Sequence, residues 1–347
     1  DVGPLTDENR IIVREGLARL NNTRYPGIKA LMDLINLEQG TLDTESLSFG
    51  LIPRLNASGR LSTAQTSLDL LLSSTVDEAR PLAEDLDRQN LERRTLTAKA
   101  VQEAKEQVEA KPDGPPPIII VEHTEWLPGI LGLIASNLSE LYYRPVVAVR
   151  NEGDLSRASA RSIREFDMIA TLHRTGAPFE RVGGHPMAAG FTISTKDLPN
   201  LILEMTEMAS LELAETNLRP KIHIDCEITP KLLSNSNFEF IESLGPFGAG
   251  NPRPVFLTRN ATVTSARQVG SDRKHLKFQV SHSGGIWNAI AFRRGDDLCA
   301  PGSHMDLVYT IQKNTWNGNV QLELNVIDFH TTNRSQASDR TIPYDFK

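Results

Sequence analysis

The segment KPDGPPPIIIVEHTEWLPGILGLIAS at residues 111–136 contains the change of pattern that decides the fold. Its first seven residues are rich in proline and glycine, which interrupt regular structure and are typical of a domain boundary. The apolar runs at 118–121 and 145–149 predict buried strands, and residues 129–141 between them predict a helix. Strand, helix and strand in this order predict an α/β domain. A helix at 167–174, a strand at 191–193 and a helix at 197–213 complete it.

Upstream of this boundary the pattern predicts helices. Residues 6–75 are expected to be mostly helical, interrupted by a polar loop, PRLNASGR, at 53–60. Residues 75–111 predict one long charged helix with Thr75 as its N-cap. Pro81 lies inside it, so we expect a kink or a separate short helix there. A helix that is polar on most faces commonly bridges two domains.

From residue 219 onward the pattern changes to alternating strands. Short strands at nearly regular spacing predict a small barrel, and the turn signal Asn317-Gly318-Asn319 predicts a hairpin within it. Five or six strands with one basic surface that carries aromatic residues fit an OB-fold. Residues 331–347 are expected to form a polar tail.

Composition restricts the class of protein. The chain has 347 residues, 39% hydrophobic and 23% charged, which is typical of a folded protein of two or three domains. No apolar run is long enough to span a membrane. The first residues resemble no signal peptide and read as the middle of a longer chain. Two cysteines far apart in sequence fit a reducing compartment, so we expect a cytoplasmic protein.

Charge along the chain is uneven. The net charge of −7 argues against a protein that coats polyanions generally, but a nucleic-acid enzyme needs only a local basic surface. The segment 253–294 is rich in basic residues. These include Arg259, Arg267, Arg273, Lys274, Lys277 and Arg293.

The stretch GGHPMAAGF at residues 183–191 is the most direct indication of a ligand. Adjacent glycines allow close approach of the backbone, and a histidine follows them. A loop with free N–H groups and small side chains suits a phosphate. A pair of glycines also marks ordinary turns, so the stretch alone leaves both interpretations open.

Five stretches in order carry a family resemblance: DVGPLTDENR at 1–10, PRLNASGR at 53–60, WLPGILGLIAS at 126–136, ASARS at 158–162 and GGHPMAAGF at 183–191. Together they resemble the RecJ family of bacterial 5′-to-3′ exonucleases specific for single-stranded DNA, within the DHH phosphoesterase superfamily. The resemblance covers residues 1–330. It implies an α/β plus all-β architecture: the helical C-terminal part of a DHH domain at 1–74, a connecting helix at 75–112, an α/β DHHA1 domain at 113–217 and an OB-fold β-barrel at 218–330.

The same resemblance implies a two-metal site, but this chain contains few of the residues that would bind the metals. No Asp-His-His motif is present, and Asp1 matches the last metal-ligand aspartate of the family. A carboxylate suits Mn²⁺ or Mg²⁺, but one carboxylate cannot hold the two ions that activate water and stabilise the leaving oxygen. We therefore expect the longer protein to be active and this chain alone to be inactive. For Asp1 in isolation, a frayed terminus is the better interpretation.

Residues that bind the 5′ end follow from the resemblance. Ser159 and Arg161 match the pocket for the terminal phosphate, and a guanidinium with a hydroxyl suits that anion. The alternative for Arg161 is a surface arginine in a turn, which is the expectation for its neighbours Arg157 and Arg164. Gly183, Gly184 and His185 match the part that faces the metal site. From the residues alone, His185 either binds a phosphate oxygen or braces the loop.

Further contacts to DNA are expected on a loop and on the barrel. Asn56 and Arg60 match a family loop near the active site, where they would hold the DNA backbone. On the barrel, Arg273, Lys274 and Lys277 are candidates for phosphate contacts. Aromatic residues there are candidates for stacking on bases, although alternation assigns Phe278 and Phe292 to the core. The aromatic candidates are Trp287, Phe278, Phe292 and Trp316.

The function that these observations favour is metal-dependent hydrolysis of single-stranded DNA from its 5′ end, in DNA repair and recombination. Single-stranded DNA is the expected partner, and a single-strand-binding protein or a helicase is a candidate protein partner. Two alternatives stay open. One is a phosphodiesterase of the DHH family for short oligonucleotides or cyclic dinucleotides. The other is a non-catalytic relative that binds single-stranded DNA without metals.

Overall fold

A computed structural model describes residues 3–270, 272–316, 319–331 and 345–346. The chain forms two compact units, one of residues 20–220 and one that combines residues 1–19 with 221–347. Each unit is described by itself. Among the described residues, no helix is both long enough and apolar enough to cross a membrane.

The first unit begins with short helices that pack on one long helix. Leu31, Leu70 and Leu86 are fully buried and join these helices in one apolar core. The expected polar loop at 53–60 is wrong, because the chain there continues as two short helices joined at Asn56, whose backbone stays in the helical region. The helices and the π-helical turn are α2 (Pro26–Leu34), α3 (Thr44–Ser46), η1 (Leu47–Leu51), α4 (Ile52–Leu55), α5 (Ala57–Leu61) and α6 (Gln65–Leu72).

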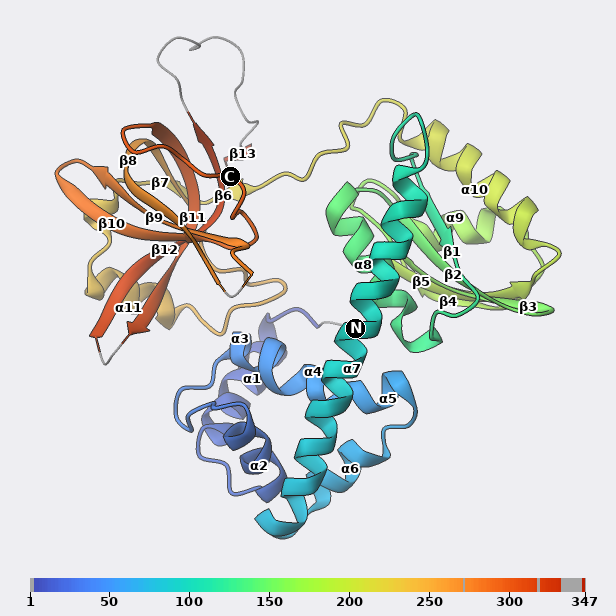
Figure 1. Ribbon diagram of the computed structural model, residues 1–347, viewed down its shortest axis with the longest axis horizontal. Helices are drawn as coiled ribbons and strands as arrows, with labels where there is room; N and C mark the ends of the chain where they lie inside the picture. The colour runs from blue at the N-terminus through green and yellow to red at the C-terminus, as the bar shows by residue number, and fades with distance from the viewer. Residues whose placement is uncertain (1–2, 271, 317–318, 332–344, 347) are drawn as a thin grey trace. The chain divides into compact units, whose positions relative to one another are not determined.

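The long helix α7 (Val76–Glu109) confirms the connecting helix. Thr75 is its N-cap, and the Thr75 hydroxyl accepts a hydrogen bond from the Glu78 N–H at 3.2 Å. Pro81 neither ends the helix nor separates a short one, because it removes only a single backbone donor within 34 residues. One half of α7 packs on the short helices, and the other half packs on the sheet domain (Figure 1).

The sheet domain has five strands in the order β1-β2-β3-β5-β4. Strands β1 and β2 are parallel and are connected through α8, which confirms the strand–helix–strand prediction. The remaining pairs are antiparallel. The elements are β1 (Ile119–Glu122), α8 (Pro128–Tyr142), β2 (Val146–Glu152), β3 (Leu155–Arg161), α9 (Met168–Arg174), β4 (Phe179–His185), β5 (Ala188–Ser194) and α10 (Leu198–Glu212).

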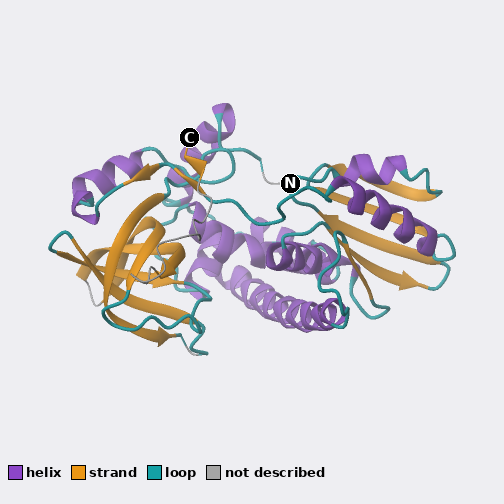
Figure 2. Ribbon diagram, turned by 90° about the horizontal axis from the view of Figure 1, so that it is seen from above, coloured by secondary structure: helices purple, strands orange, loops and turns teal. Residues whose placement is uncertain are grey.

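Helices cover the two faces of this sheet unequally (Figure 2). On one face, α9 and α10 pack on β2, β3 and β5 around buried residues such as Phe166 and Ile193. On the other face, α7 and α8 pack on β1 and β2 around Ile134 and Val146. Strand β4 is largely exposed. The β4–β5 side of this second face is therefore bare, and it is available for a ligand.

The second unit is built on a closed barrel. Its strands follow the order β11-β12-β10-β9-β8, and β11 also pairs with β8, which closes the sheet. Among these five described strands, β10 and β12 form the one parallel pair, and the other neighbouring pairs are antiparallel. This connectivity confirms the predicted OB-fold barrel. The strands are β8 (Phe256–Val269), β9 (His275–His282), β10 (Gly285–Ala291), β11 (His304–Trp316) and β12 (Asn319–Thr331).

The N-terminal segment belongs to the barrel unit. The Leu5 N–H donates to the Ala249 carbonyl at 2.5 Å, and Arg10 donates to the carbonyls of residues 244 and 245. A Cβ at Gly250 would lie 2.9 Å from the Pro4 side chain, so the approach requires glycine. Helices α1 (Asp7–Leu20) and α11 (Asn235–Ser243) and the 3-10 turn η2 (Pro230–Leu232) belong to the same region of the fold.

The ends of the β region differ from the expectation. The alternating run at 222–228 forms two short strands, β6 (His223–Ile224) and β7 (Cys226–Glu227), instead of one. Strand β13 (Asp345–Phe346) pairs in parallel with β6, so these two residues are not part of a polar tail. Residues 332–344 and the turn residues 317–318 lie outside the described part of the chain.

Aromatic residues of the barrel are placed as follows. Phe278 is 2% exposed and lies in the core, as alternation predicts. Phe292 was expected in the core and is 51% exposed, because β10 ends at Ala291 and the alternation ends with it. Trp287 packs partly against the core. The side chain of Trp316 lies outside the described structure.

Candidate phosphate groove and nucleic-acid interface

The stretch at residues 183–191 is a β-hairpin and not a loop. Gly183, Gly184 and His185 end strand β4, and the following strand begins at Ala188. The turn is held because the Ser162 N–H donates to the Met187 carbonyl at 2.9 Å and the Met168 N–H to the Pro186 carbonyl at 3.0 Å. The expectation of a glycine-rich loop was wrong because glycines favour turns locally but also fit a strand that is closely packed.

The two glycines have different reasons to be glycine. Gly184 has a φ of 148°, and a Cβ there would lie 2.4 Å from the Ala188 carbonyl oxygen. Gly183 faces open space, because a Cβ added there would meet no described atom within 4 Å. Gly184 is therefore required by the hairpin itself, whereas the absence of a side chain at Gly183 leaves room on the surface.

The register of the sheet brings most of the predicted residues of this domain together. Paired residues of neighbouring strands point to the same face, and alternate residues of one strand share that face. Three rows across β3, β5 and β4 result, each with a small or short residue at its centre. The inner row is Arg161, Ala188 and His185, the middle row is Ser159, Gly190 and Gly183, and the outer row is Arg157, Thr192 and Arg181.

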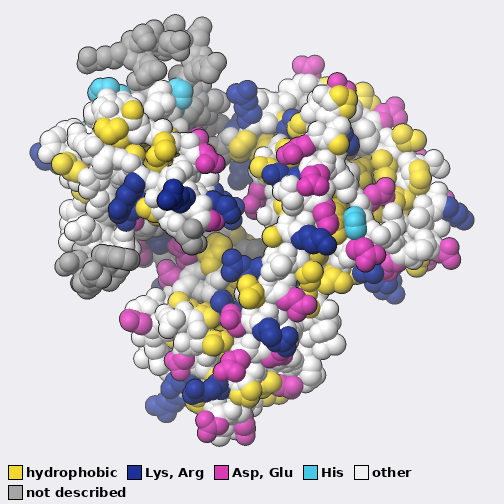
Figure 3. Space-filling model, in the orientation of Figure 1, with side chains coloured by type: hydrophobic (Ala, Val, Ile, Leu, Met, Phe, Trp, Pro, Cys, Tyr) yellow, Lys and Arg dark blue, Asp and Glu magenta, His cyan; other side chains and the backbone are white. Residues whose placement is uncertain are grey.

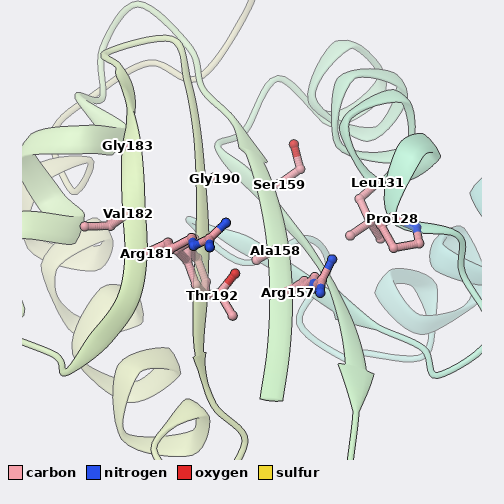
Figure 4. A pocket seen from close by; sticks show the side chains of 11 residues that line it. Pro128, Leu131, Arg157, Ala158, Ser159, Arg181, Val182, Gly183, Gly190 and Thr192 are labelled. Carbon is pink, nitrogen blue, oxygen red and sulfur yellow. The ribbon is translucent and has the colours of Figure 1, made fainter. Parts of the chain in front are cut away.

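The middle and outer rows form the floor of an open groove of about 460 Å³, and the inner row adjoins it along the strands. Pro128 and Leu131 of α8 line one side of it, and β4 lines the other (Figure 4). The glycines of the middle row leave the floor without side chains beside Ser159. Because strands lie ~4.8 Å apart, the Cα atoms of Arg161 and His185 are separated by roughly 10 Å, which a nucleotide phosphate can span with its contacts.

Three half-buried arginines, none paired with a carboxylate of a described residue, surround the start of α8. We call Arg60, Arg93 and Arg161 the arginine cluster. Their hydrogen bonds are to neutral acceptors: Arg60 donates to the Gly129 carbonyl at 3.2 Å and Arg161 to the Ala160 carbonyl at 2.8 Å. Arg93 donates to the Asn90 side chain at 2.9 Å, and its Nε is buried with no acceptor among the described residues.

Glycines in α8 allow this clustering. A Cβ at Gly129 would lie 2.0 Å from the Arg60 carbonyl oxygen, so α5 and α8 touch through their backbones. A Cβ at Gly132 would lie 2.8 Å from Arg161 Nη2 and 3.1 Å from Ser159 Oγ. The motif WLPGILG therefore provides contact surface for two arginines, which the sequence alone does not reveal.

The electrostatics of the cluster favour an anion. Burial lowers the pKa of Arg161, and the nearby charge of Arg60 lowers it further. Burial likewise lowers the pKa of Arg93, with smaller contributions from Arg60 and Arg94. Each guanidinium remains charged near neutral pH, so the cluster carries like charges that repel each other in a partly desolvated place. A bound anion would relieve this repulsion.

Two arginines near the groove were missed from the sequence. Arg93 was part of a helix interpreted as solvated. Its role becomes visible only from its half-burial and from the nearby charge of Arg60 on α5. Arg181 carries no motif, although its spacing of two and four residues from Gly183 and His185 on one strand is a signal that could have found it. Arg157 was predicted to be a surface arginine, and it is exposed at the edge of the groove.

The other predicted residues lie as follows. His185 and Asn56 are exposed, and their functional roles stay predictions. Asp1 lies outside the described residues. Within the described residues, no three His, Cys, Asp or Glu side chains gather in a way that could hold a metal ion. The described part of the chain therefore does not provide the donor set that a two-metal site needs.

Some of the basic residues of the barrel are paired with acids. Lys277 lies 3.1 Å from Glu323, which is 3% exposed, and Lys274 lies 2.9 Å from Asp272. Arg273 is exposed and forms no ion pair with a described residue. Basic and acidic groups are both visible on the molecular surface (Figure 3). The pairing of Lys277 gives it a structural role, and its predicted contact with phosphate is untested.

Comparison with known proteins decides the family. Residues 116–210 match the model of the DHHA1 domain, and residues 224–328 match the model of the RecJ OB domain. The single-stranded-DNA-specific exonuclease RecJ of Bacillus subtilis is 33% identical over 332 residues, which cover 94% of this chain and 42% of that protein. The chain belongs to the RecJ family.

Further RecJ proteins are similar to this chain over nearly its whole length. RecJ of Escherichia coli is 31% identical over 94% of this chain and 58% of its own length. The crystal structure of RecJ with Mg²⁺ from Thermus thermophilus superposes with a TM-score of 0.80 at 28% identity, over 96% of this chain and 50% of that one. The chain thus spans about half the length of the curated RecJ relatives that it matches.

Proposed function

We propose that this chain is the end-binding and strand-binding part of a metal-dependent 5′-to-3′ exonuclease for single-stranded DNA. The arginine cluster with Ser159 binds the terminal 5′-phosphate, and the barrel holds the strand that follows. The observation that carries the proposal is a set of three half-buried arginines, without carboxylate partners among the described residues, beside a groove whose middle row has no bulky side chains.

The chemistry of the terminal phosphate fits this arrangement. A 5′-phosphate is a dianion, whereas a phosphodiester within the strand carries one negative charge. Guanidinium groups form charge-assisted hydrogen bonds that are about twice as strong as neutral ones. Ser159 Oγ lies 3.4 Å from Arg161 Nη1 and adds a hydroxyl donor. The cluster therefore favours a phosphorylated end over a hydroxyl end.

The proposal also includes hydrolysis that is assisted by divalent metal ions. RecJ structures from Thermus thermophilus have been solved with Mg²⁺ and with Mn²⁺. Such ions lower the pKa of bound water and stabilise the leaving oxygen of a phosphodiester. In this proposal the residues of this chain bind and orient the end of the strand. The described residues contain no cluster of His, Cys, Asp or Glu that could hold a metal ion.

The test measures binding of fluorescent single strands by anisotropy. The strands carry a 5′-phosphate or a 5′-hydroxyl, and a duplex of the same sequence is the third ligand. We expect the phosphorylated strand to bind most tightly and all affinities to fall as salt rises. Arg161→Ala should remove about 1.5–3 kcal/mol of phosphate binding, and Arg161→Lys should restore only part of it.

Arg88→Ala is the matched control. Arg88 lies on α7 with Arg93, but its side chain is exposed and pairs with Asp85. The proposal fails if Arg161→Ala keeps the full preference for a 5′-phosphate, or if Arg88→Ala reduces that preference as strongly. Equal affinity for single strand and duplex would refute the role of the barrel.

A further inference from the structure

The groove continues beyond the residues that the proposed function uses. The inner and middle rows contain Arg161 and Ser159. The outer row lies two residues further along each strand, on the side away from His185, and contains Arg157, Thr192 and Arg181. Two residues of a strand span about 6.6 Å. An anion with several linked phosphates can cover that distance from Ser159 to the outer row.

Arg181 is the free cation of this row. Its side chain is exposed and forms no hydrogen bond or ion pair with any residue that the structure describes. It lies beside Thr192 above β5 (Figure 4). Thr192 adds a hydroxyl that can donate to a phosphate oxygen.

Arg157 adds charge on the opposite side. Arg157 Nε lies 3.2 Å from Glu152 Oε2, and Arg150 Nε lies 3.2 Å from Glu152 Oε1. One carboxylate is therefore shared by two guanidinium groups, so this end of the groove keeps a net positive charge. The outer row carries positive charge from both sides of the groove, whereas its centre holds only the short Thr192.

The path between the rows is open. Gly190 and Gly183 form the middle of the floor with Ser159, and a Cβ at Gly183 would meet no described atom within 4 Å. A single phosphate bound at Ser159 and Arg161 would leave the outer row empty. An extended anion with several phosphates would reach both rows without crossing a side chain.

We propose that the outer row binds the additional phosphates of a 5′-triphosphorylated strand, beyond the phosphate held by Ser159 and Arg161. This inference rests on the proposed function, which places the terminal 5′-phosphate at Ser159 and Arg161. The shared chemistry is a chain of linked phosphates. Its source is either the 5′ end of a strand or a free nucleoside triphosphate, and the experiment separates them.

The experiment compares one oligonucleotide with a 5′-hydroxyl, a 5′-monophosphate and a 5′-triphosphate, using the 347-residue chain. We expect the triphosphate to bind most tightly. Arg181→Ala should weaken triphosphate binding about tenfold, the effect of about 1.4 kcal/mol, and should leave monophosphate binding unchanged. Arg157→Ala should act in the same direction more weakly, because Arg157 is partly neutralised by Glu152.

A nucleoside triphosphate as competitor identifies the source. Displacement of the triphosphorylated strand only at concentrations far above that of the strand supports a 5′ end as the ligand. Displacement at equal concentration assigns the row to free nucleotides and overturns the inference. The inference also fails if the triphosphate binds no better than the monophosphate, or if Arg181→Ala weakens all three strands equally.

Failure of the proposed function gives a different result. If Arg161→Ala leaves the preference for a monophosphate intact, the inner site is misplaced whatever the triphosphate does. If monophosphate preference depends on Arg161 but triphosphate adds nothing, only the outer row is refuted. Arg88→Ala again serves as the control for loss of a surface charge.

Discussion

Replacing Gly132 with alanine should stabilise the protein while it weakens binding of the 5′-phosphate. Gly132 lies inside α8, where glycine costs roughly 0.5–1 kcal/mol relative to alanine. The new methyl group would lie 2.8 Å from Arg161 Nη2 and 3.1 Å from Ser159 Oγ. Both atoms are at the ends of side chains that can rotate away, so the helix need not move.

The same substitution should weaken the binding of phosphate. Displacing the guanidinium of Arg161 removes charge-assisted hydrogen bonds worth about 1.5–3 kcal/mol, which corresponds to roughly a tenfold to hundredfold loss of affinity. We expect the temperature of unfolding to rise slightly in calorimetry. In anisotropy titrations the ratio of affinities for 5′-phosphate and 5′-hydroxyl strands should fall.

Gly16→Ala is the control for helix propensity. Gly16 lies in α1, is exposed, and leaves open space for an added Cβ, which would meet no described atom within 4 Å. The exchange should therefore stabilise α1 without touching the groove. If Gly132→Ala binds phosphorylated strands as tightly as the parent chain, Arg161 and Ser159 do not hold the phosphate. If it lowers the unfolding temperature, α8 has moved and the geometric argument is refuted.

Two further predictions concern the hairpin and the barrel. Gly184→Ala should destabilise the protein by about 1–3 kcal/mol in denaturant unfolding because of its φ of 148°, whereas Gly183→Ala should be nearly neutral; equal effects would contradict the assigned strain. Lys277→Met should cost about 3 kcal/mol because it leaves Glu323 buried without a counter-charge. A loss of DNA affinity with unchanged stability would instead assign Lys277 to phosphate binding.

Much of the fold could be predicted from the sequence, because local patterns carry it. Apolar runs at 118–121 and 145–149 with a helix between them define the α/β domain. A charged helix with Thr75 as its N-cap and regular alternation in the barrel define the rest. The predictions were wrong where tertiary contacts outweighed the local conformational preference of the residues. This occurred in the helical segment 53–60 and in the strand that contains Gly183 and Gly184.

The site could be predicted only in part. The motifs named Ser159, Arg161, Arg60 and the glycines because the resemblance rests on short stretches of consecutive residues. Arg93 and Arg181 were not found, since nothing in their local sequence distinguishes them from surface arginines.

The sequence by itself thus determined the order of the domains and the types of residue available to bind a phosphate. Only the tertiary structure decided which of them share a site, because strand register and the contact of α5 with α8 join segments far apart in the chain. Within the described residues, it also separated arginines that acids neutralise from those without carboxylate partners. The physical reason is that charge pairing depends on distance in space, which composition and spacing along the chain do not specify.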